Sequence, residues 1–475
     1  MPRAVIWLRR DLRLSDHLPL QAALDRGQAP VFVYVHAPEE EGEWRPGAAS
    51  LAWLDRSLRA LEADLKARGG GLLLRRGPTV ETLTQLARDC EAEAVYWQRR
   101  YEPALIERDT AVKRALKNAG LDAESFRGAT LFERDEVQTG QGGPYRVFTP
   151  FWRNARPRVE LAPAEPAPER LPAPPQVDSL SVDALQLRPA LGWDSGFWAR
   201  FEPGEKGAAE ALEAFIEGAA ASYMKQRDLP DRAGTSRLSA HLHFGEITPA
   251  QVIRRLQQEP WPAAAESEVE GYIRELGWRE FNAHLLYHYP HTASENLNPR
   301  FANFNWAENA EHLRAWQRGR TGVPVVDAGM RELWHTGWMH NRVRMIVASF
   351  LTKNLRQHWL HGARWFWDTL VDADLGNNTG GWQWSAGTGA DAAPYFRIFN
   401  PVSQAEKFDA RGEYIRQWVP ELRRLPDKAL YAPFEHADLK RRLAPDYPLP
   451  VVDLKASRAA ALSAYQSTGS SRAAG

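Results

Sequence analysis

The chain has 475 residues, with 60 basic and 60 acidic side chains and a formal net charge of zero. This length exceeds that of one ordinary hydrophobic core, so we expect two or three domains. Hydrophobic residues at 44% and charged residues at 25% are typical of a globular protein and exclude a disordered chain. The balanced charge excludes an overall field that would attract nucleic acid or a membrane, but it does not exclude local patches.

A single cysteine, Cys90, excludes an intramolecular disulfide framework and a cysteine-rich zinc site. The first residues do not resemble a signal peptide, and no apolar run approaches transmembrane length. We therefore expect a cytoplasmic monomer with no metal and no membrane contact. Tryptophan is the outlier, with 19 copies, most of them from Trp261 onward. This excess favours ring stacking, electron transfer or an unusually aromatic core.

Short β-branched or aromatic runs alternate with amphipathic helical stretches over the first 130 residues. The alternation predicts an α/β domain, with helices on both faces of a doubly wound parallel sheet. No Gly-x-Gly-x-x-Gly or Walker loop occurs, so no dinucleotide or nucleoside triphosphate site is predicted there. The predicted strands are residues 4–8, 31–36, 72–75, 94–97 and 121–126, and the predicted helices are residues 18–26, 48–68, 80–90 and 104–119.

Residues 157–189 contain eight prolines and no sustained periodicity, which predicts a long connector lying over the surface. Helical periodicity dominates from about residue 207, so the second domain is predicted to be all-helical. The predicted division is an α/β domain over 1–130, a connector over 131–205 and a helical domain over 206–475, with residues 467–475 disordered. The clearest apolar helical faces are in residues 208–221, 249–258, 266–289, 310–318, 324–335 and 340–355.

Residues 372–384 read Asp-Ala-Asp-Leu-Gly-Asn-Asn-Thr-Gly-Gly-Trp-Gln-Trp. Glycines permit close approach of the backbone, and the acids and amides can bind the polar edges of a ring and a sugar. Two tryptophans add large flat faces. The segment therefore suits a flat, hydrogen-bonding cofactor with a second flat ligand against it. The alternative is a glycine-rich turn with core tryptophans.

Two earlier motifs also carry polar chemistry. The segment Gly-Thr-Ser-Arg-Leu-Ser at residues 234–239 offers hydroxyls and backbone N–H groups before an apolar run, which suits either helix capping or phosphate binding. In Glu-Leu-Gly-Trp-Arg-Glu-Phe at residues 275–281, Glu275 and Trp278 share a helix face. A carboxylate beside an indole can hold an imide and stack on a pyrimidine. The alternative is a half-buried amphipathic helix.

Two later motifs are basic. In Trp-Met-His-Asn-Arg-Val-Arg-Met at residues 338–345, Asn341, Arg344 and Met345 lie on one side of a helix and Arg342 points away. Arginines in an apolar helix need partners, so we predict that Arg344 pairs with Asp372. Residues 395–404 mix aromatics with a basic and an amide side chain, which suits contact with a nucleic-acid backbone. A core turn is the alternative there.

Taken in order, these motifs resemble the photolyase/cryptochrome family. Further segments carry the likeness: Trp-Leu-Arg-Arg-Asp-Leu-Arg-Leu-Ser-Asp, which ends at Asp16, and Asp-Ala-Ala-Pro-Tyr-Phe-Arg-Ile-Phe-Asn-Pro, which ends at residue 401. The likeness extends to about residue 433. It implies an N-terminal α/β antenna domain and a helical domain that holds a U-shaped FAD.

Matched motif by motif, the resemblance implies the cofactor site. Asn378 would face flavin N5, with Asn377 as a rival because Thr379 interrupts the family's Asn-Asn-Gly-Gly. Arg344, Asp372 and Asp374 would hold the flavin and ribose side. The phosphate side would be held by Tyr223, Thr235, Ser236, Arg237, Leu238 and Ser239.

The resemblance also implies the substrate site on UV-damaged DNA, whose dimer is flipped into a pocket. Glu275 would act on the dimer, in a pocket lined by Glu275, Trp278, Asn341, Met345 and Trp384. DNA phosphates would meet Arg227, Arg342, Arg397 and Gln404. A chain of three tryptophans from the flavin to the surface would be Trp382, Trp359 and Trp306.

Within the family, Asn341 and Met345 stand where (6-4) photolyases carry histidines, and there is no long regulatory tail. The resemblance therefore implies a light-driven lyase of the class I type that repairs cyclobutane pyrimidine dimers. A cryptochrome without repair activity and a non-catalytic binding module are the alternatives. The segment beginning at Tyr101 lacks the Asn-Glu pair that binds folate in relatives. A folate antenna is therefore not expected, and a deazaflavin, another flavin or no antenna stay open.

Overall fold

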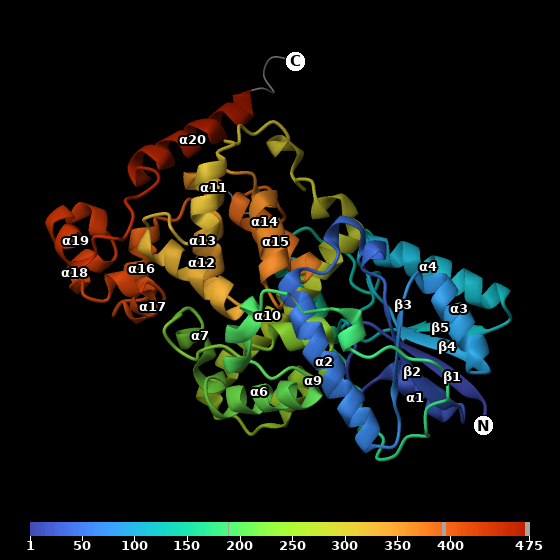
Figure 1. Ribbon diagram of the computed structural model, residues 1–475. Coiled ribbons are helices and arrows are strands. Elements are labelled where there is room, and N and C mark those ends of the chain that lie inside the picture. Colours follow the sequence, from blue (N-terminus) through green and yellow to red (C-terminus); the bar gives the residue numbers. More distant parts are fainter. Residues whose placement is uncertain (189, 392–395, 471–475) are drawn as a thin grey trace.

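The computed structural model describes residues 1–188, 190–391 and 396–470. Figure 1 shows an N-terminal part with a sheet beside a larger part built from helices, with α2 (Ala48–Ala67) running between them. No helix in the described part of the chain is both long and apolar enough to span a bilayer.

The sheet has five parallel strands in the order β3-β2-β1-β4-β5. Each predicted strand overlaps one observed strand. Strands buried on both faces need continuous apolar runs, which is why the inner strands were readable in the sequence, whereas the edge strand β5 is largely polar. The strands are β1 (Arg3–Leu8), β2 (Ala29–His36), β3 (Leu72–Arg76), β4 (Ala92–Gln98) and β5 (Asp122–Phe126).

Helices cover both faces of this sheet, which confirms the doubly wound α/β prediction. One face packs against α3 (Thr79–Asp89) and α4 (Pro103–Asn118). The other packs against α1 (Leu18–Asp25) and α2, and this core continues into the helical part through Phe244 and Val371. The two parts therefore share one hydrophobic core along α2.

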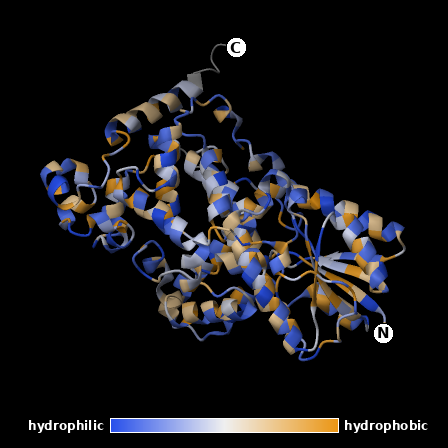
Figure 2. Cartoon of the chain, viewed as in Figure 1, coloured by the Kyte–Doolittle hydropathy of each residue, from blue (hydrophilic) through white to orange (hydrophobic). Residues whose placement is uncertain are grey.

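Every strand in the described part of the chain belongs to this sheet, so the rest is helical, as predicted. Figure 2 shows that single helices carry both hydrophilic and hydrophobic residues, as expected for helices packed on one side. The remaining helices are α5 (Phe148–Ala155), α6 (Glu205–Glu217), α7 (Tyr223–Gln226), α8 (Ser239–Phe244), α9 (Pro249–Gln258), α10 (Ala263–His288), α11 (Ala310–Gln317), α12 (Pro324–Thr336), α13 (Asn341–Ser349), α14 (Trp359–Thr369), α15 (Leu375–Ala386), α16 (Pro401–Phe408), α17 (Glu413–Trp418), α18 (Asp427–Leu430), α19 (Ala437–Leu443) and α20 (Leu454–Ser470).

The helix predicted over 340–355 is present over 341–354, with its last turn, Phe350–Asn354, in a π-helical conformation. One prediction about the helical part is wrong. The disorder predicted from residue 467 is wrong as far as Ser470, because α20 continues to that residue. Its aromatic and alanine residues pack on a separate small core and stabilise the helix. Residues 471–475 of the same prediction lie outside the described residues.

The proline-rich connector lies along the α/β part. Leu171 N–H donates to Arg68 O at 2.8 Å, and Leu180 N–H donates to Leu74 O at 3.0 Å. Leu171 is buried in the core shared with α2. Residue 189, at the end of the predicted connector, lies outside the described residues. Apolar side chains among the prolines thus tie this segment to the surface, as the prediction of a surface connector requires.

Candidate functional site

A cavity of about 550 Å³ opens among α8, α10, α13 and α15. Its volume lies within the usual range for cofactor and ligand sites. This cavity is lined by every residue predicted to hold the cofactor and by every residue predicted for the dimer pocket. It is also lined by one predicted DNA-phosphate contact, Arg227, and by one member of the predicted tryptophan chain, Trp382. These residues are Tyr223, Arg227, Thr235, Ser236, Arg237, Leu238, Ser239, Glu275, Trp278, Asn341, Arg344, Met345, Asp372, Asp374, Asn378, Trp382 and Trp384.

Residues 375–386 form helix α15, so the alternative of a glycine-rich turn is wrong. Asp374 is the N-cap and accepts the Asn377 N–H at 2.9 Å, which starts the helix. A Cβ at Gly380 would lie 2.3 Å from Asn282 Oδ1 of α10. Glycine is therefore required at residue 380 so that α15 can press against α10 and form the wall of the cavity.

The two neighbouring amides, Asn377 and Asn378, have different partners. Asn377 Oδ1 accepts from Asn282 Nδ2 at 2.9 Å, so this amide is held against α10. Asn378 Nδ2 donates to Ala363 O of α14 at 3.0 Å. That bond orients Asn378 and leaves its amide oxygen as the acceptor for an N–H group in the cavity.

Arg344 and Asp372 form the predicted ion pair, with Arg344 Nη2 and Asp372 Oδ2 2.8 Å apart. Arg344 Nε also donates to Met339 O at 2.7 Å, which holds the guanidinium in place. Asp372 is only 8% exposed, and its Oδ1 has no hydrogen-bond partner in the described structure. A buried carboxylate oxygen without a partner is costly, so this atom calls for a donor on a bound molecule.

The hydroxyl-rich segment before α8 does not cap that helix. Leu238 occupies the N-cap position, without a side-chain capping bond. Ser236 Oγ instead accepts from Tyr272 Oη at 2.9 Å and from Leu238 N–H at 3.3 Å. Arg237 has φ +54°, a left-handed conformation that non-glycine residues seldom adopt outside functional sites. The capping interpretation is therefore wrong, and the segment faces the cavity.

Glu275 and Trp278 share the cavity face of α10, as predicted. Arg227 Nη1 donates to Glu275 Oε1, so these two residues form an ion pair inside the cavity. Trp278 stacks on Phe148 of α5, with ring centroids 3.8 Å apart and planes 10° apart. Phe148 therefore backs one face of the indole. No sequence signal marked Phe148, because it lies in the segment predicted as connector.

The residues predicted for DNA phosphates are not all in one place. Arg342 lies outside the cavity, with Nη2 2.8 Å from Asp228 Oδ2 and its guanidinium over the Phe408 ring of α16. Gln404 is one turn before Phe408 on α16. Arg397 lines a second cavity, and Tyr395 of the same motif lies outside the described residues.

Of the three predicted tryptophans, Trp382 lines the cavity and Trp359 and Trp306 do not. Trp382 is buried, and Gly362 of α14 makes room for its indole, since a Cβ there would lie 2.0 Å from the ring. Trp359, one turn before Gly362, is fully buried and donates to Asn296 Oδ1 at 2.8 Å.

The His358 ring lies between Trp359 and Trp306. Its centroid is 5.7 Å from that of Trp359 and 5.1 Å from that of Trp306, which is partly buried. Trp359, His358 and Trp306 thus form a row of aromatic rings that runs from a fully buried ring to a partly buried one.

Sequence reasoning missed Asn282 and His340. Asn282 follows Glu275 by seven residues on α10, so the helical period could have placed it on the same face. His340 is the N-cap of α13, where its Nδ1 accepts the Arg342 N–H at 3.2 Å. Within the described part of the chain, no cluster of three or more His, Cys, Asp or Glu residues could hold a metal ion.

His340 should make stability depend on pH. Burial lowers its pKa from 6.5 to about 4, and the Arg344 and Arg342 charges act in the same direction. As the pH falls from 7 to 5, His340 binds a proton in the unfolded chain but stays neutral in the folded chain. The free energy of unfolding therefore decreases by about 2 kcal/mol through this residue.

In His340→Asn the cap acceptor is kept and the titrating group is removed. We expect the loss of unfolding free energy between pH 7 and pH 5 to be about 2 kcal/mol smaller than in the wild type. Urea unfolding at the two pH values measures this difference. Equal losses in the two proteins would show that His340 titrates normally.

Comparisons with known proteins agree with the geometry. Residues 4–174 match the DNA photolyase family, and residues 272–467 match the FAD binding domain of DNA photolyase. The chain is 45% identical to a deoxyribodipyrimidine photo-lyase of Agrobacterium fabrum, with 97% of each chain covered. It is 39% identical to that of Escherichia coli, with 98% of this chain and 99% of the relative covered. Cryptochrome-1 of Arabidopsis thaliana is 36% identical, with 96% of this chain and 69% of the relative covered.

A solved structure is also similar over nearly the whole chain. The class III photolyase of Agrobacterium tumefaciens superposes with a TM-score of 0.92 at 42% identity, covering 99% of this chain and 98% of the other.

The residues present fit FAD. The unpartnered Asp372 Oδ1 and the free amide oxygen of Asn378 can each accept an N–H of the flavin ring system. Arg344 and the hydroxyls of Thr235 and Ser239 line the same cavity and can face the ribose and phosphates. A matched flavin domain, whole-length relatives and this donor set lead to one conclusion: the chain belongs to the photolyase/cryptochrome family.

Proposed function

We propose that this protein is a deoxyribodipyrimidine photo-lyase, which uses light to repair cyclobutane pyrimidine dimers in DNA. The observation that carries the proposal is that one cavity holds both groups of residues. The amide and carboxylate acceptors for FAD stand in the same cavity as Glu275, Trp278, Asn341, Met345 and Trp384. The full-length relatives named as photo-lyases, at 39% to 45% identity, support the same reaction.

FAD in its reduced form supplies light-driven electron donation when bound, and the protein orients and tunes it. In this chain Asn378, whose orientation is fixed by Ala363 O, would accept an N–H of the flavin. Arg344 and Asp372 would hold another polar edge of the cofactor, and their mutual ion pair keeps both side chains in place. Tyr223 and residues 235–239 would hold the phosphate side.

The substrate enters as a flipped dimer, which costs less than flipping an intact pair because the dimer stacks poorly. Trp384 and Trp278 form apolar walls, and Phe148 keeps the Trp278 ring rigid from behind. Glu275 hydrogen-bonds the carbonyl and imide edge of the dimer, and Arg227 holds Glu275 in position. The Arg227 cation and a proton shared between Glu275 and the dimer carbonyl stabilise the negative charge that develops on the substrate.

Finer features are also part of the proposal. The choice of Asn341 and Met345 favours cyclobutane dimers over (6-4) products, but it does not distinguish class I from class III, so the class I type stays a prediction. The domain division at about residues 130 and 205, a cytoplasmic location and a monomeric state stay predictions too. A second chromophore is open, as a deazaflavin, another flavin or none.

Repair under blue light is the test of the function. The purified protein, with its FAD chemically reduced, should restore an oligonucleotide with a single thymine dimer, measured as regained absorbance of the intact bases. A flavin-containing protein that binds the oligonucleotide without repairing it would be a cryptochrome-type photoreceptor. A colourless protein without flavin would support the binding module.

Arg342 provides a prediction about DNA affinity. If its guanidinium exchanges Asp228 for a phosphate, Arg342→Ala should weaken binding of dimer-containing DNA and lower the salt slope of log K by about one unit. Arg114→Ala is the matched control, because Arg114 is an exposed arginine of α4 on the outer face of the sheet. Titrations between low and high salt measure both slopes. An unchanged slope for Arg342→Ala would remove it from the DNA interface.

A further inference from the structure

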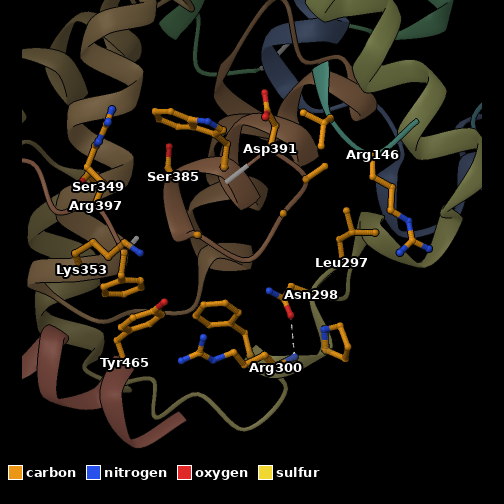
Figure 3. Close-up of a pocket in the computed structure, with 18 of the residues that line it drawn as sticks. Arg146, Leu297, Asn298, Arg300, Ser349, Lys353, Ser385, Asp391, Arg397 and Tyr465 are labelled. Carbon is orange, nitrogen blue, oxygen red and sulfur yellow. Dashed lines mark hydrogen bonds between the residues drawn. The ribbon is translucent and has the colours of Figure 1, made fainter. Parts of the chain in front are cut away.

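A second cavity of about 550 Å³ lies beside the first one (Figure 3). Trp384, Ser385 and Ala390 line both cavities, so the C-terminal end of α15 is a shared wall. On its other sides the second cavity is lined by the 3-10 turn Pro299–Phe301 and by Tyr465 of α20. It is therefore next to the proposed dimer pocket without being part of it.

The second cavity is basic, although the chain as a whole is neutral. Figure 3 shows Lys353 and Arg397 on one side of it, Arg146 on the opposite side and Arg300 at the bottom of the view, and Asp391 is the acidic residue among its described lining residues. Lys353 is 1% exposed, and its Nζ donates to Ala386 O and lies 3.2 Å from the Phe396 ring centroid. Its ammonium group is therefore engaged inside the protein and is not available to a ligand.

Two exposed arginines are available at the rim. Neither Arg146 nor Arg300 forms an ion pair within the described ranges of the chain. Arg146 Nε donates to Tyr289 Oη at 2.7 Å, which aims the guanidinium without neutralising it. Arg300 lies over the Tyr465 ring at 4.8 Å. Both side chains are held by aromatic residues and keep their charge for an anionic ligand.

The wall beneath Arg300 is an aromatic stack. Tyr465 and Phe396 are parallel, with centroids 4.6 Å apart and planes 11° apart, and Phe301 stacks on both at longer distances. The Arg300 guanidinium, lying on this aromatic stack, offers a flat cationic face on which a base can stack. The charges of Arg146 and Arg300 at the rim can bind a phosphate. A flat, anionic ligand such as a nucleotide fits this combination.

We propose that this cavity binds the nucleotide next to the dimer in the damaged strand, with its phosphate at Arg146 and Arg300 and its base over the Arg300–Tyr465 stack. The proposal rests on the proposed function. A flipped dimer stays covalently joined to a neighbour on each side, so the strand must leave the first cavity past one of its walls. The Trp384 wall leads directly to the second cavity. The contact is independent of sequence, because every base has a flat face.

The test compares two substrates in the wild type and in variants. Arg300→Ala and Tyr465→Leu should each lower the affinity for a dimer within a long oligonucleotide by about tenfold, the size of effect seen when a stacking side chain is removed. Both should leave the affinity for an isolated dimer dinucleotide unchanged, since that substrate has no neighbour. Repair per photon at saturating substrate should not change. Tyr465→Phe keeps the ring and should bind as the wild type, and Arg114→Ala is the charge control.

The outcomes separate this proposal from the function on which it rests. Wild-type affinity of Arg300→Ala for the long oligonucleotide would overturn the nucleotide site, and so would an equal loss for both substrates. Since Arg300 is exposed, its replacement remains informative even if Tyr465→Leu does not fold. Binding of free dAMP that is lost in Arg300→Ala, without any effect on oligonucleotide affinity, would assign the cavity to a free nucleotide instead. A wild type that repairs neither substrate would refute the proposed function itself.

Discussion

Replacing Trp382 by phenylalanine is expected to remove most of the photoreduction of oxidised FAD, yet to spare repair by protein whose FAD is reduced chemically beforehand. Trp382 is the predicted tryptophan that lines the cavity, and its indole lies on Gly362, one turn from Trp359. Phenylalanine is much harder to oxidise than indole. The replacement therefore stops electron transfer along the tryptophan chain at the residue next to the flavin. Repair sends the electron to the dimer and does not use this path.

The measurement is the loss of oxidised-flavin absorbance under blue light with an external electron donor. Phenylalanine keeps an apolar ring against Gly362, so the fold should persist. Trp334→Phe is the matched control, because Trp334 is 50% exposed and does not line the cavity. Normal photoreduction in Trp382→Phe would show that another route dominates, and loss of repair in the chemically reduced variant would give Trp382 a role in the repair step itself.

Glu275→Ala is expected to lower the yield of repair per photon by about tenfold or more, a smaller loss than the roughly 10²- to 10³-fold that removal of one oxyanion-hole donor costs, because the Arg227 cation remains. Glu275 meets the polar edge of the dimer, where negative charge arrives during repair. A carboxyl group that shares a proton with the dimer carbonyl binds more strongly in that state than in the ground state, whereas a bare carboxylate would repel the charge. Dimer affinity should fall less, since arginines and the two tryptophan walls supply most of it.

The Arg227 ion pair makes the design of this experiment more precise. Glu275→Ala also leaves the Arg227 guanidinium, 19% exposed, without its partner. Glu275→Gln keeps a hydrogen-bond donor but has no acidic proton to share with the dimer, so its yield should lie between those of Ala and wild type. Arg227→Ala should mainly weaken binding. Quantum yield, dimer affinity and melting temperature are measured side by side, with FAD fully reduced. If the melting temperature falls while the yield stays at the wild-type value, Glu275 is a structural residue only.

The local pattern of apolar and polar residues was sufficient to predict the order of strands and helices along the chain. Strands β1 and β2 were readable because they are buried on both faces and apolar nearly throughout, whereas the edge strand β5 is polar and was identified by its place in the alternation. Helix faces placed Glu275 beside Trp278 and Asn341 beside Met345, since a helical period of 3.6 residues is a local property. The same period did not reveal that the helix changes from α to π at Phe350–Asn354, because a π turn leaves no mark in the apolar pattern.

Long-range contacts were decided by the tertiary structure. Phe148 reaches Trp278 from a segment that reads as connector, and the ion pair of Arg227 with Glu275 joins residues 48 positions apart. Asn377 and Asn378 have different hydrogen-bond partners because Asn377 faces Asn282 of α10 and Asn378 faces Ala363 of α14.

The sequence by itself determined the two kinds of domain, the family and the residues that meet in one cavity. These follow from the spacing of apolar residues and from the order of the motifs, which are both local properties of the chain. The tertiary structure alone decided which charges are paired and which polar atoms stay free. It also decided that a second, basic cavity shares the Trp384 wall. These properties depend on packing between elements far apart in the sequence, and no local pattern encodes the distance between Arg300 and Tyr465.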